Sequence, residues 1–326
     1  MLTSRFRRFL ARALAPDPSV RLDQVASELS ALRNALSAVQ SCPCEAPRYT
    51  YLGGNVGLVR LASGDKLFVD TRDRSMTPFL IENGQWEPHV SNIIREILQP
   101  EMTAIDVGTN FGVHMLIASR CVGANGRVIA LEPNPQFTRL LRDTLEINGI
   151  NNVELHQCAA LDHEKTIEIM VPSGHMGGGA VALPSWNEDP YFQHHDRYKA
   201  PANRLDDMVP AGQSVGLIRI DAEGTDIAVL MGARRILENL PHIAVIAEWG
   251  QYNMRYYFDV NEGVSYFVNL GFAFWRICRD GGLTSMRADQ MKELALRADQ
   301  MKGLEICDVL IARPASLPEA LKLKVN

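Results

Sequence analysis

The fold is decided by the stretch Ala104-Ile105-Asp106-Val107-Gly108-Thr109-Asn110-Phe111-Gly112, in which an apolar strand runs into a glycine-rich turn. A helix is predicted to follow over 113–121. Glycine is needed where the backbone has a positive φ or touches a ligand. In an open α/β sheet, such a turn lies at the carboxyl ends of the strands, where ligands bind. The stretch therefore predicts the first strand–turn–helix unit of a ligand-binding α/β domain.

Strand-like and helix-like patterns alternate through the following two hundred residues or so. This alternation predicts an α/β fold with a doubly wound, mostly parallel sheet and helices on both faces, of the Rossmann-like kind. The expected strands are 127–131, 153–160, 216–220 and 243–248, the expected helices are 135–148 and 226–240, and a terminal strand pair is expected at 272–277 and 308–312.

The chain before this domain divides into two zones. The first is a helical extension, and the second contains a short strand at 67–69 and a helix at 90–98. Turn signals such as Gly53-Gly54-Asn55 separate the short pieces of the second zone. We therefore expect four parts: 1–41 (extension), 42–100 (strands and helix leading into the catalytic domain), 101–315 (ligand-binding domain) and 316–326 (tail).

The extension allows two interpretations at each of its helices. Four arginines and no acid accompany the apolar residues of 1–15, which suits peripheral contact with an anionic membrane or docking on the chain itself. Apolar residues of 22–39 follow an a/d heptad spacing, which suits a short coiled coil and a homo-oligomer, or packing on the body of the chain. The sequence does not decide between the two interpretations for either helix.

Composition excludes several classes of protein. The chain has 326 residues and a net charge of −5, and this balance argues against a surface that binds nucleic acid. Six cysteines are scattered, apart from Cys42 and Cys44, so neither a zinc site nor a disulfide framework is predicted. The most apolar runs are only of strand length, too short to cross a bilayer. We expect a cytoplasmic protein in a reducing compartment.

Two acidic residues point to the kind of ligand. Asp106 ends the first strand, and Glu132 ends the next one, where a carboxylate can accept hydrogen bonds from a ribose diol. The dinucleotide pattern GxGxxG and the phosphate loop GxxxxGK[ST] are both absent. A nucleoside that carries a positive charge and no phosphate fits these features, and S-adenosylmethionine is such a molecule.

With these motifs the chain resembles the FkbM family of class I S-adenosylmethionine-dependent methyltransferases. The resemblance covers about 67–312 and lies in the segments 84–88, 105–112, 131–134, 204–207, 220–224, 229–233 and 308–310. Its most specific part is Ile220-Asp221-Ala222-Glu223-Gly224. The family pattern usually has alanine where Thr109 stands.

The resemblance implies that a methyl group passes from S-adenosylmethionine to an oxygen, often a hydroxyl of a sugar, glycolipid or natural product. Asp106 and the turn from Gly108 to Gly112 would hold the amino-acid end of the donor, and Glu132 would hold its ribose. The full set expected to bind the cofactor is Glu87, Asp106, Gly108, Asn110, Gly112, Glu132, Pro133, Cys158 and Ala159.

Asp221 and Glu223 are the expected catalytic residues, because they follow a central strand and could remove the proton of the acceptor hydroxyl. A structural role at the start of the next helix stays open for both. Asp221, Glu223 and Glu248 could hold a metal on charge alone, but their spacing has no diagnostic pattern, so no metal is expected. The acceptor, a small-molecule or glycan hydroxyl, should depend on loops between about 173 and 202, which include His175, His194 and His195. A catalytically silent scaffold of the same fold and a nicotinamide-dependent oxidoreductase remain as alternatives.

Overall fold

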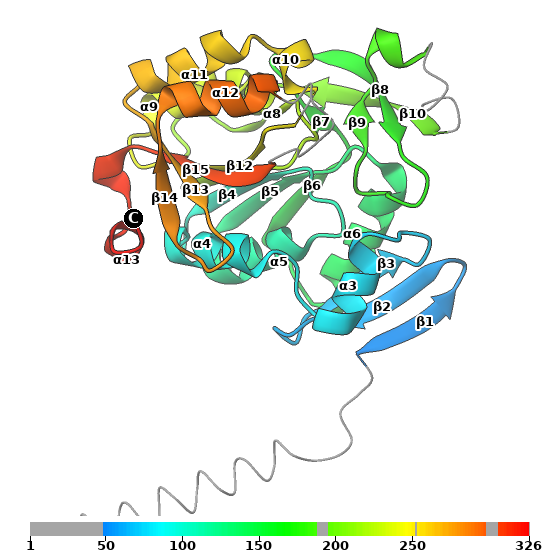
Figure 1. Cartoon of the computed structure of the whole chain (residues 1–326). Coiled ribbons are helices and arrows are strands. Elements are labelled where there is room, and N and C mark those ends of the chain that lie inside the picture. The colour runs from blue at the N-terminus through cyan, green and yellow to red at the C-terminus, as the bar shows by residue number, and fades with distance from the viewer. Residues whose placement is uncertain (1–47, 188–194, 252, 298–305, 326) are drawn as a thin grey trace, which may run out of the picture. The chain divides into compact units, whose positions relative to one another are not determined.

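The predicted strand–turn–helix unit is present: β4 (Thr103–Val107) is followed by the glycine turn and by α5 (Val113–Val122). These coordinates come from a computed structural model, which describes residues 48–187, 195–251, 253–297 and 306–325 (Figure 1). The extension over 1–41, with its predicted membrane contact and coiled coil, lies outside the described residues.

The main sheet has eight strands in the order β14-β13-β15-β12-β11-β4-β5-β6. The five strands from β12 to β6 pair in parallel, whereas β15 pairs antiparallel with both β12 and β13. The predicted mostly parallel sheet and its terminal strand pair are therefore confirmed. The remaining bounds are β5 Arg127–Leu131, β6 Val153–His156, β11 Leu217–Ile220, β12 Ala244–Trp249, β13 Ala273–Ile277, β14 Leu283–Met286 and β15 Cys307–Ala312.

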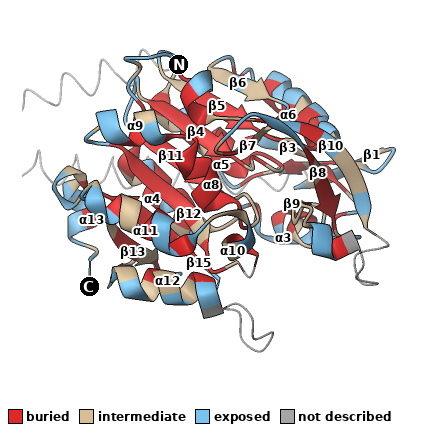
Figure 2. Ribbon diagram, turned by 90° about the horizontal axis from the view of Figure 1, so that it is seen from above, coloured by how far each residue is buried: buried red, intermediate tan, exposed pale blue. Residues whose placement is uncertain are grey.

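Helices cover both faces of this sheet, as the doubly wound prediction requires (Figure 1). One face carries α4 (Pro88–Ile97), α5 and α6 (Pro135–Ile147), and the other carries α8 (Asp226–Met231), α9 (Arg234–Asn239), α11 (Val260–Asn269) and α12 (Ala288–Arg297). Each face has its own hydrophobic core. Along β5, Val128 and Ala130 join the first core, and Ile129 and Leu131 join the second. Burial on both sides explains why the central strands are almost wholly apolar (Figure 2).

Two predicted elements are broken in the structure. The strand expected over 153–160 ends at His156, and its last residues, β7 (Ala159–Ala160), join a second sheet of order β7-β10-β8-β9. This sheet contains β8 (Lys165–Val171), β9 (Ala180–Val181) and β10 (Asp196–Asn203). The helix expected over 226–240 divides after α8, because Gly232 lies so close to another segment that a Cβ there would be 2.0 Å from the carbonyl oxygen of Leu161.

A third sheet precedes the main one and is joined to it through α6. Its strands β1 (Tyr49–Gly53), β2 (Val56–Arg60) and β3 (Lys66–Asp70) are antiparallel, and α3 (Met76–Asn83) follows them. The backbone N–H of Phe68 in β3 donates to Oγ1 of Thr144 in α6 at 3.1 Å. Residues from Arg48 onward form one compact unit, which has no division near residue 100.

Short elements complete the described chain: η1 Pro184–Asn187, α7 Leu205–Met208, α10 Met254–Tyr257, η3 Pro314–Ser316 and α13 Glu319–Lys322. Across residues 48–187, 195–251, 253–297 and 306–325, none of the helices has the length and apolar character needed to cross a membrane.

Candidate active site

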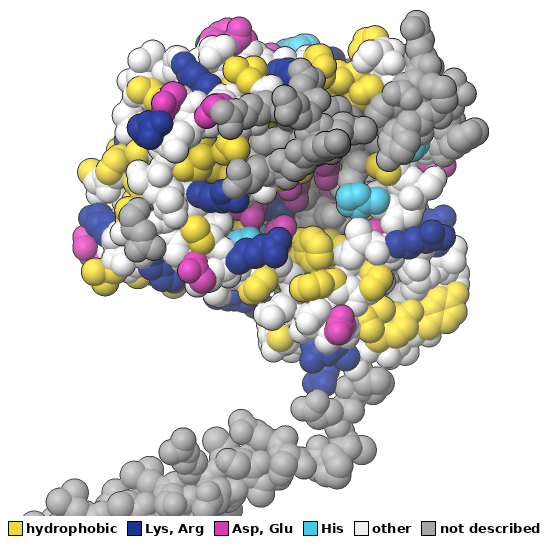
Figure 3. Space-filling view, in the orientation of Figure 1, with side chains coloured by type: hydrophobic (Ala, Val, Ile, Leu, Met, Phe, Trp, Pro, Cys, Tyr) yellow, Lys and Arg dark blue, Asp and Glu magenta, His cyan; other side chains and the backbone are white. Residues whose placement is uncertain are grey.

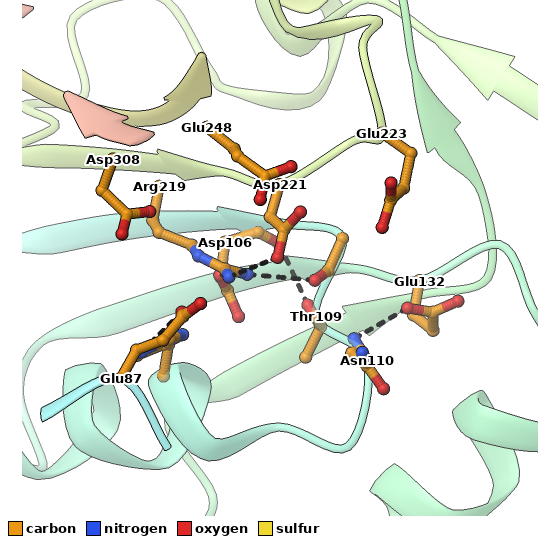
Figure 4. Close-up of polar contacts among 12 residues, drawn as sticks. Glu87, Asp106, Thr109, Asn110, Glu132, Arg219, Asp221, Glu223, Glu248 and Asp308 are labelled. Atoms are coloured by element: carbon orange, nitrogen blue, oxygen red, sulfur yellow. Dashed lines mark hydrogen bonds and ion pairs between the residues drawn. The ribbon is translucent and has the colours of Figure 1, made fainter. Parts of the chain in front are cut away.

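A buried ion pair lies under the carboxyl ends of the central strands. Arg219 of β11 pairs in register with Asp106 of β4, and both side chains face the core under α4 and α5. Nη1 of Arg219 lies 3.4 Å from Asp106 Oδ1 and donates to the carbonyl oxygen of Gly108 at 3.0 Å, while Nη2 donates to Asp221 Oδ2 at 2.8 Å (Figure 4). Burial raises the pKa of Asp106, and Arg219 opposes that rise. Arg219 therefore joins β4, the glycine turn and Asp221.

The glycine turn depends on its backbone conformation and on close contact with the neighbouring strand end. Gly108 has φ 74°, and a Cβ there would lie 1.8 Å from the carbonyl oxygen of Asp221. Asn110 and Gly112 also have positive φ, 54° and 97°. No side chain fits at Gly108, and the turn therefore presents its backbone at the edge of the sheet.

Glu132 fixes the end of β5 to this turn. Its carboxylate is 5% exposed and accepts hydrogen bonds from the backbone N–H groups of Asn110 and Asn134, both at 2.8 Å (Figure 4). Burial raises the pKa of Glu132 to about 7, against the lowering effect of these two bonds. The carboxylate is thus held in one orientation between two strand ends.

One cavity brings together most of the predicted site residues. Its lining includes Gly108, Asn110, Glu132, Pro133, Ala159, Asp221 and Glu223. The other four predicted residues lie elsewhere. Asp106 is buried beside Arg219, Gly112 begins α5, Cys158 packs in a hydrophobic core, and Glu87 lines a separate groove.

A segment of the second sheet closes the same cavity. Met176, Gly177, Gly179 and Tyr198 are part of the lining. A Cβ on Gly177 would lie 2.4 Å from Asn110 Nδ2, so this segment packs directly against the glycine turn. The loops expected to shape the acceptor site therefore lie over the turn expected to hold the donor. His194 is outside the described residues, and neither His175 nor His195 is part of the lining.

Gln251 bridges the carboxylates of Glu223, which lines this cavity, and Glu248. Glu223, whose backbone has φ 51°, follows β11, and Glu248 belongs to β12. The side-chain nitrogen Nε2 of Gln251 donates to Glu223 Oε2 at 3.1 Å and to Glu248 Oε2 at 2.5 Å. Burial and the nearby carboxylate of Asp221 raise the pKa of both glutamates well above the usual range.

A groove adjoins these carboxylates on the side away from Glu132. Glu87, Glu248 and Asp308 are among its lining residues, as are Phe79 and Trp86, whose rings meet edge to face at 5.4 Å. His89 Nε2 lies 3.0 Å from Asp308 Oδ2. Figure 3 shows acidic side chains recessed near the middle of the face in view, with Lys or Arg and His side chains around them. Within the described residues, no three His, Cys, Asp or Glu side chains are grouped so that they could hold a metal ion.

Sequence reasoning missed Arg219 and Gln251. Arg219 could have been found from the sequence, because it is a lone charge within the apolar strand Leu217–Ile220. A buried arginine needs a partner of opposite charge. No feature of the sequence pointed to Gln251, because a glutamine in a loop is ordinary in any sequence. Glu248 stands next to the same site, although the sequence offered it only as a ligand of a metal site with Asp221 and Glu223.

The sheet order, the glycine turn and the acid at the end of β5 define an α/β methyltransferase with a Rossmann-like sheet. The model of the methyltransferase FkbM domain matches residues 106–274, slightly more than half of the chain, so the chain belongs to the FkbM methyltransferase family. The family resemblance and the methyl-transfer class expected from the sequence are thereby confirmed, and S-adenosylmethionine is the methyl donor.

Solved structures similar to this chain are also methyltransferases. They include an rRNA methylase from Streptococcus thermophilus (13% identity, 69% of this chain and 93% of that chain, TM-score 0.38). A precorrin-6y C5,15-methyltransferase from Geobacter metallireducens has 14% identity over 70% of this chain and 89% of that chain, with a TM-score of 0.35. M. jannaschii TYW2 in complex with AdoMet has 9% identity over 80% of this chain and 86% of that chain, with a TM-score of 0.39. Similarity at this level carries no information about the acceptor. No curated protein matches the chain.

Proposed function

We propose that the protein transfers the methyl group of S-adenosylmethionine to a hydroxyl oxygen of a sugar, glycolipid or natural product. The observation that carries this proposal is that one cavity is lined both by the donor-side residues Gly108 and Glu132 and by the carboxylates of Asp221 and Glu223. A hydroxyl must lose its proton during methyl transfer, and a carboxylate beside the reacting oxygen can accept that proton.

The residues on the donor side fit S-adenosylmethionine. Both carboxylate oxygens of Glu132 accept one backbone hydrogen bond, and each keeps a lone pair for a ribose hydroxyl. Asn110 Oδ1 and Asp106 Oδ2 are buried without a hydrogen-bond partner. Arg219 forms ion pairs with two carboxylates of this site, Asp106 and Asp221. Among the described residues, the cavity lining contains Glu132, Asp221 and Glu223 but no Lys or Arg, which suits a ligand with an ammonium and a sulfonium group.

When bound, the donor supplies a methyl group already activated by its sulfonium. The chain then has to align the acceptor, exclude water and remove a proton. Asp221 is held by Arg219 at 2.8 Å, which keeps that carboxylate oriented. Burial raises the pKa of Glu223 to about 8, so the ionised form of Glu223 is a stronger base than an ordinary carboxylate.

The acceptor is proposed to approach along the groove between Trp86 and Glu248. An aromatic edge beside carboxylates can pack against the apolar face of a ring and accept hydrogen bonds from its hydroxyls. The chain has a net charge of −5, which does not favour binding the phosphates of a nucleic acid. We therefore retain the proposal of a small-molecule or glycan acceptor and no nucleic acid.

The test is a methyl-transfer screen with methyl-labelled donor over sugar, lipid and polyketide hydroxyls. Asp221→Asn and Glu223→Gln should keep their affinity for S-adenosylhomocysteine in calorimetry, and at least one should lose about 10²-fold in turnover, the scale of general-base loss. Asp207→Asn, an exposed carboxylate outside the cavity, is the control and should turn over normally. Donor binding without transfer to any hydroxyl would instead favour a catalytically silent protein of this fold.

A further inference from the structure

We propose that Gln251 is a positioning residue that joins Glu223 and Glu248 into one proton-sharing pair at the junction of the cavity and the groove. The proposal rests on the proposed function, because the pair would receive the proton of the acceptor hydroxyl. It adds two residues, Glu248 and Gln251, to the catalytic candidate Glu223.

The geometry of a shared donor carries this inference. A single nitrogen, Gln251 Nε2, donates to an oxygen of each glutamate, at 3.1 and 2.5 Å, and its two N–H groups are thereby both used. Both carboxylates must therefore lie within reach of one amide group. Glu223 lines the cavity that contains the glycine turn, and Glu248 lines the groove beside Trp86. The bridge thus connects the two spaces at the place where donor and acceptor would meet.

The backbone around Glu223 holds this arrangement in place. The side-chain amide of Asn253 donates to the carbonyl oxygen of Glu223 at 2.8 Å, and Gly224 packs so closely on Asn253 that a Cβ would lie 2.1 Å from its Oδ1. Glu223 itself keeps the left-handed φ of 51°. A strained, tightly packed residue next to a cavity is typical of a functional position.

The surroundings of the pair favour its protonated forms, so at least one proton stays bound at neutral pH. Burial raises the pKa of Glu223 and Glu248, and the carboxylates of Asp221, at the end of β11, and Asp226, in α8, raise it further. The groove beside Glu248 is also lined by two acids, Glu87 next to α4 and Asp308 of β15, and by His89, Arg276 and Arg279. Arg219 of β11 opposes these charges, but its hydrogen bonds go to Asp221 and Gly108. Desolvation is the largest cause of the raised pKa of each glutamate, and two buried carboxylates beside Asp221 do not both ionise at neutral pH.

Proton transfer to this pair accompanies methyl transfer to the acceptor. The acceptor O–H bond breaks and its proton moves to the ionised member of the pair, while the acceptor oxygen forms a bond to the methyl carbon. The bond from that carbon to sulfur breaks, and its electron pair stays on sulfur in S-adenosylhomocysteine. The proton leaves to solvent through Glu248 on the groove side.

The test is a carbon NMR titration of the full chain labelled at the side-chain carboxyl of glutamate, without donor or acceptor. Resonances are assigned with Glu223→Gln and Glu248→Gln. In the wild-type chain, at least one carboxyl of the pair should still be protonated at pH 7. Gln251→Met removes both hydrogen bonds and should raise the upper midpoint by about one pH unit, whereas Gln251→Lys places a cation there and should lower it by a similar amount.

Opposite shifts cannot come from a loss of structure, and circular dichroism checks that each variant is folded. Gln213→Met, which removes a glutamine that bonds to Thr103 far from the pair, is the matched control and should leave both midpoints unchanged. The proposal is overturned if Glu223 and Glu248 both titrate near 4.5 in the wild type, or if the two variants shift the midpoint in the same direction. Neither result depends on methyl transfer, so failure of the proposed function would be seen separately.

Discussion

Arg219 lies directly across from Asp106 in the central sheet, and its Nη1 is 3.4 Å from an oxygen of that buried carboxylate. The same guanidinium binds the carbonyl oxygen of Gly108 and the carboxylate of Asp221. One side chain therefore connects the strand, the turn expected to hold the donor and a candidate catalytic residue. Asp106, expected to bind the donor, is 2% exposed and acts on the site through this arginine.

Replacing Arg219 should therefore destabilise the protein strongly. Arg219→Met leaves Asp106 buried without its partner, and we expect a loss of about 3–5 kcal/mol in the free energy of unfolding, measured with urea. Arg287→Met, which breaks an ion pair of fully exposed side chains, should leave the urea midpoint unchanged. The double variant Arg219→Met with Asp106→Asn should recover part of the loss. Equal effects of the two single variants would contradict the role given to Arg219.

Gly108→Ala should abolish donor binding. The added Cβ would lie 1.8 Å from the carbonyl oxygen of Asp221, and φ 74° is unfavourable for alanine, so the turn must move. The matched control is Gly212→Ala, which has φ 84° but no atom within 4 Å of the added Cβ, and should cost about 1–2 kcal/mol without affecting the site. Calorimetry with S-adenosylhomocysteine separates the two. If both variants bind it normally, the turn does not hold the donor.

Glu132→Gln should weaken binding of S-adenosylmethionine by about 1.5–3 kcal/mol, because an amide places a donor where the carboxylate accepts hydrogen bonds. The wild type should also bind more weakly as the pH falls through about 7, where Glu132 becomes protonated. The variant should lack this dependence. Calorimetry at pH 6 and 8 measures both effects, and NAD should not bind at either pH. Unchanged affinity in Glu132→Gln would remove this residue from the donor site.

The free protein should lose thermal stability as the pH rises from 7 to 9. Burial, aided by nearby carboxylates, raises the pKa of Glu223 to about 8 and that of Glu248 to about 10, so both carboxyls lose their protons in the folded chain only above pH 7. A carboxyl whose folded pKa exceeds its unfolded value stabilises the fold below the unfolded pKa, and that contribution disappears as the pH rises through the folded pKa. Starting at pH 7 avoids the effect of His114, whose pKa is lowered by burial.

Melting temperatures at pH 7, 8 and 9 test this, with and without S-adenosylmethionine. The cationic donor should offset the loss, and Glu248→Gln should reduce the slope with pH in the free protein. A melting temperature that rises between pH 7 and 9 would show that these carboxyls ionise without cost, contrary to their burial.

The sequence determined the strand–turn–helix unit at 104–121, the alternation of strands and helices and the acids at the ends of β4 and β5. These features are local, because apolar periodicity and glycine positions reflect the burial and backbone conformation of neighbouring residues. The same local rules failed at 153–160, because β7 leaves the main sheet to pair with β10, and nothing within that segment encodes a partner more than forty residues away.

Only the tertiary structure decided which charges meet. Arg219 and Asp106 are separated by 113 residues and are brought together by the register of two parallel strands. Gln251 reaches both Glu223 and Glu248 because β11 and β12 are neighbours in the sheet and end at the same edge. Burial then raises the pKa of these carboxyls, and burial at a strand end depends on the helices and loops packed over it, which no short stretch of sequence specifies.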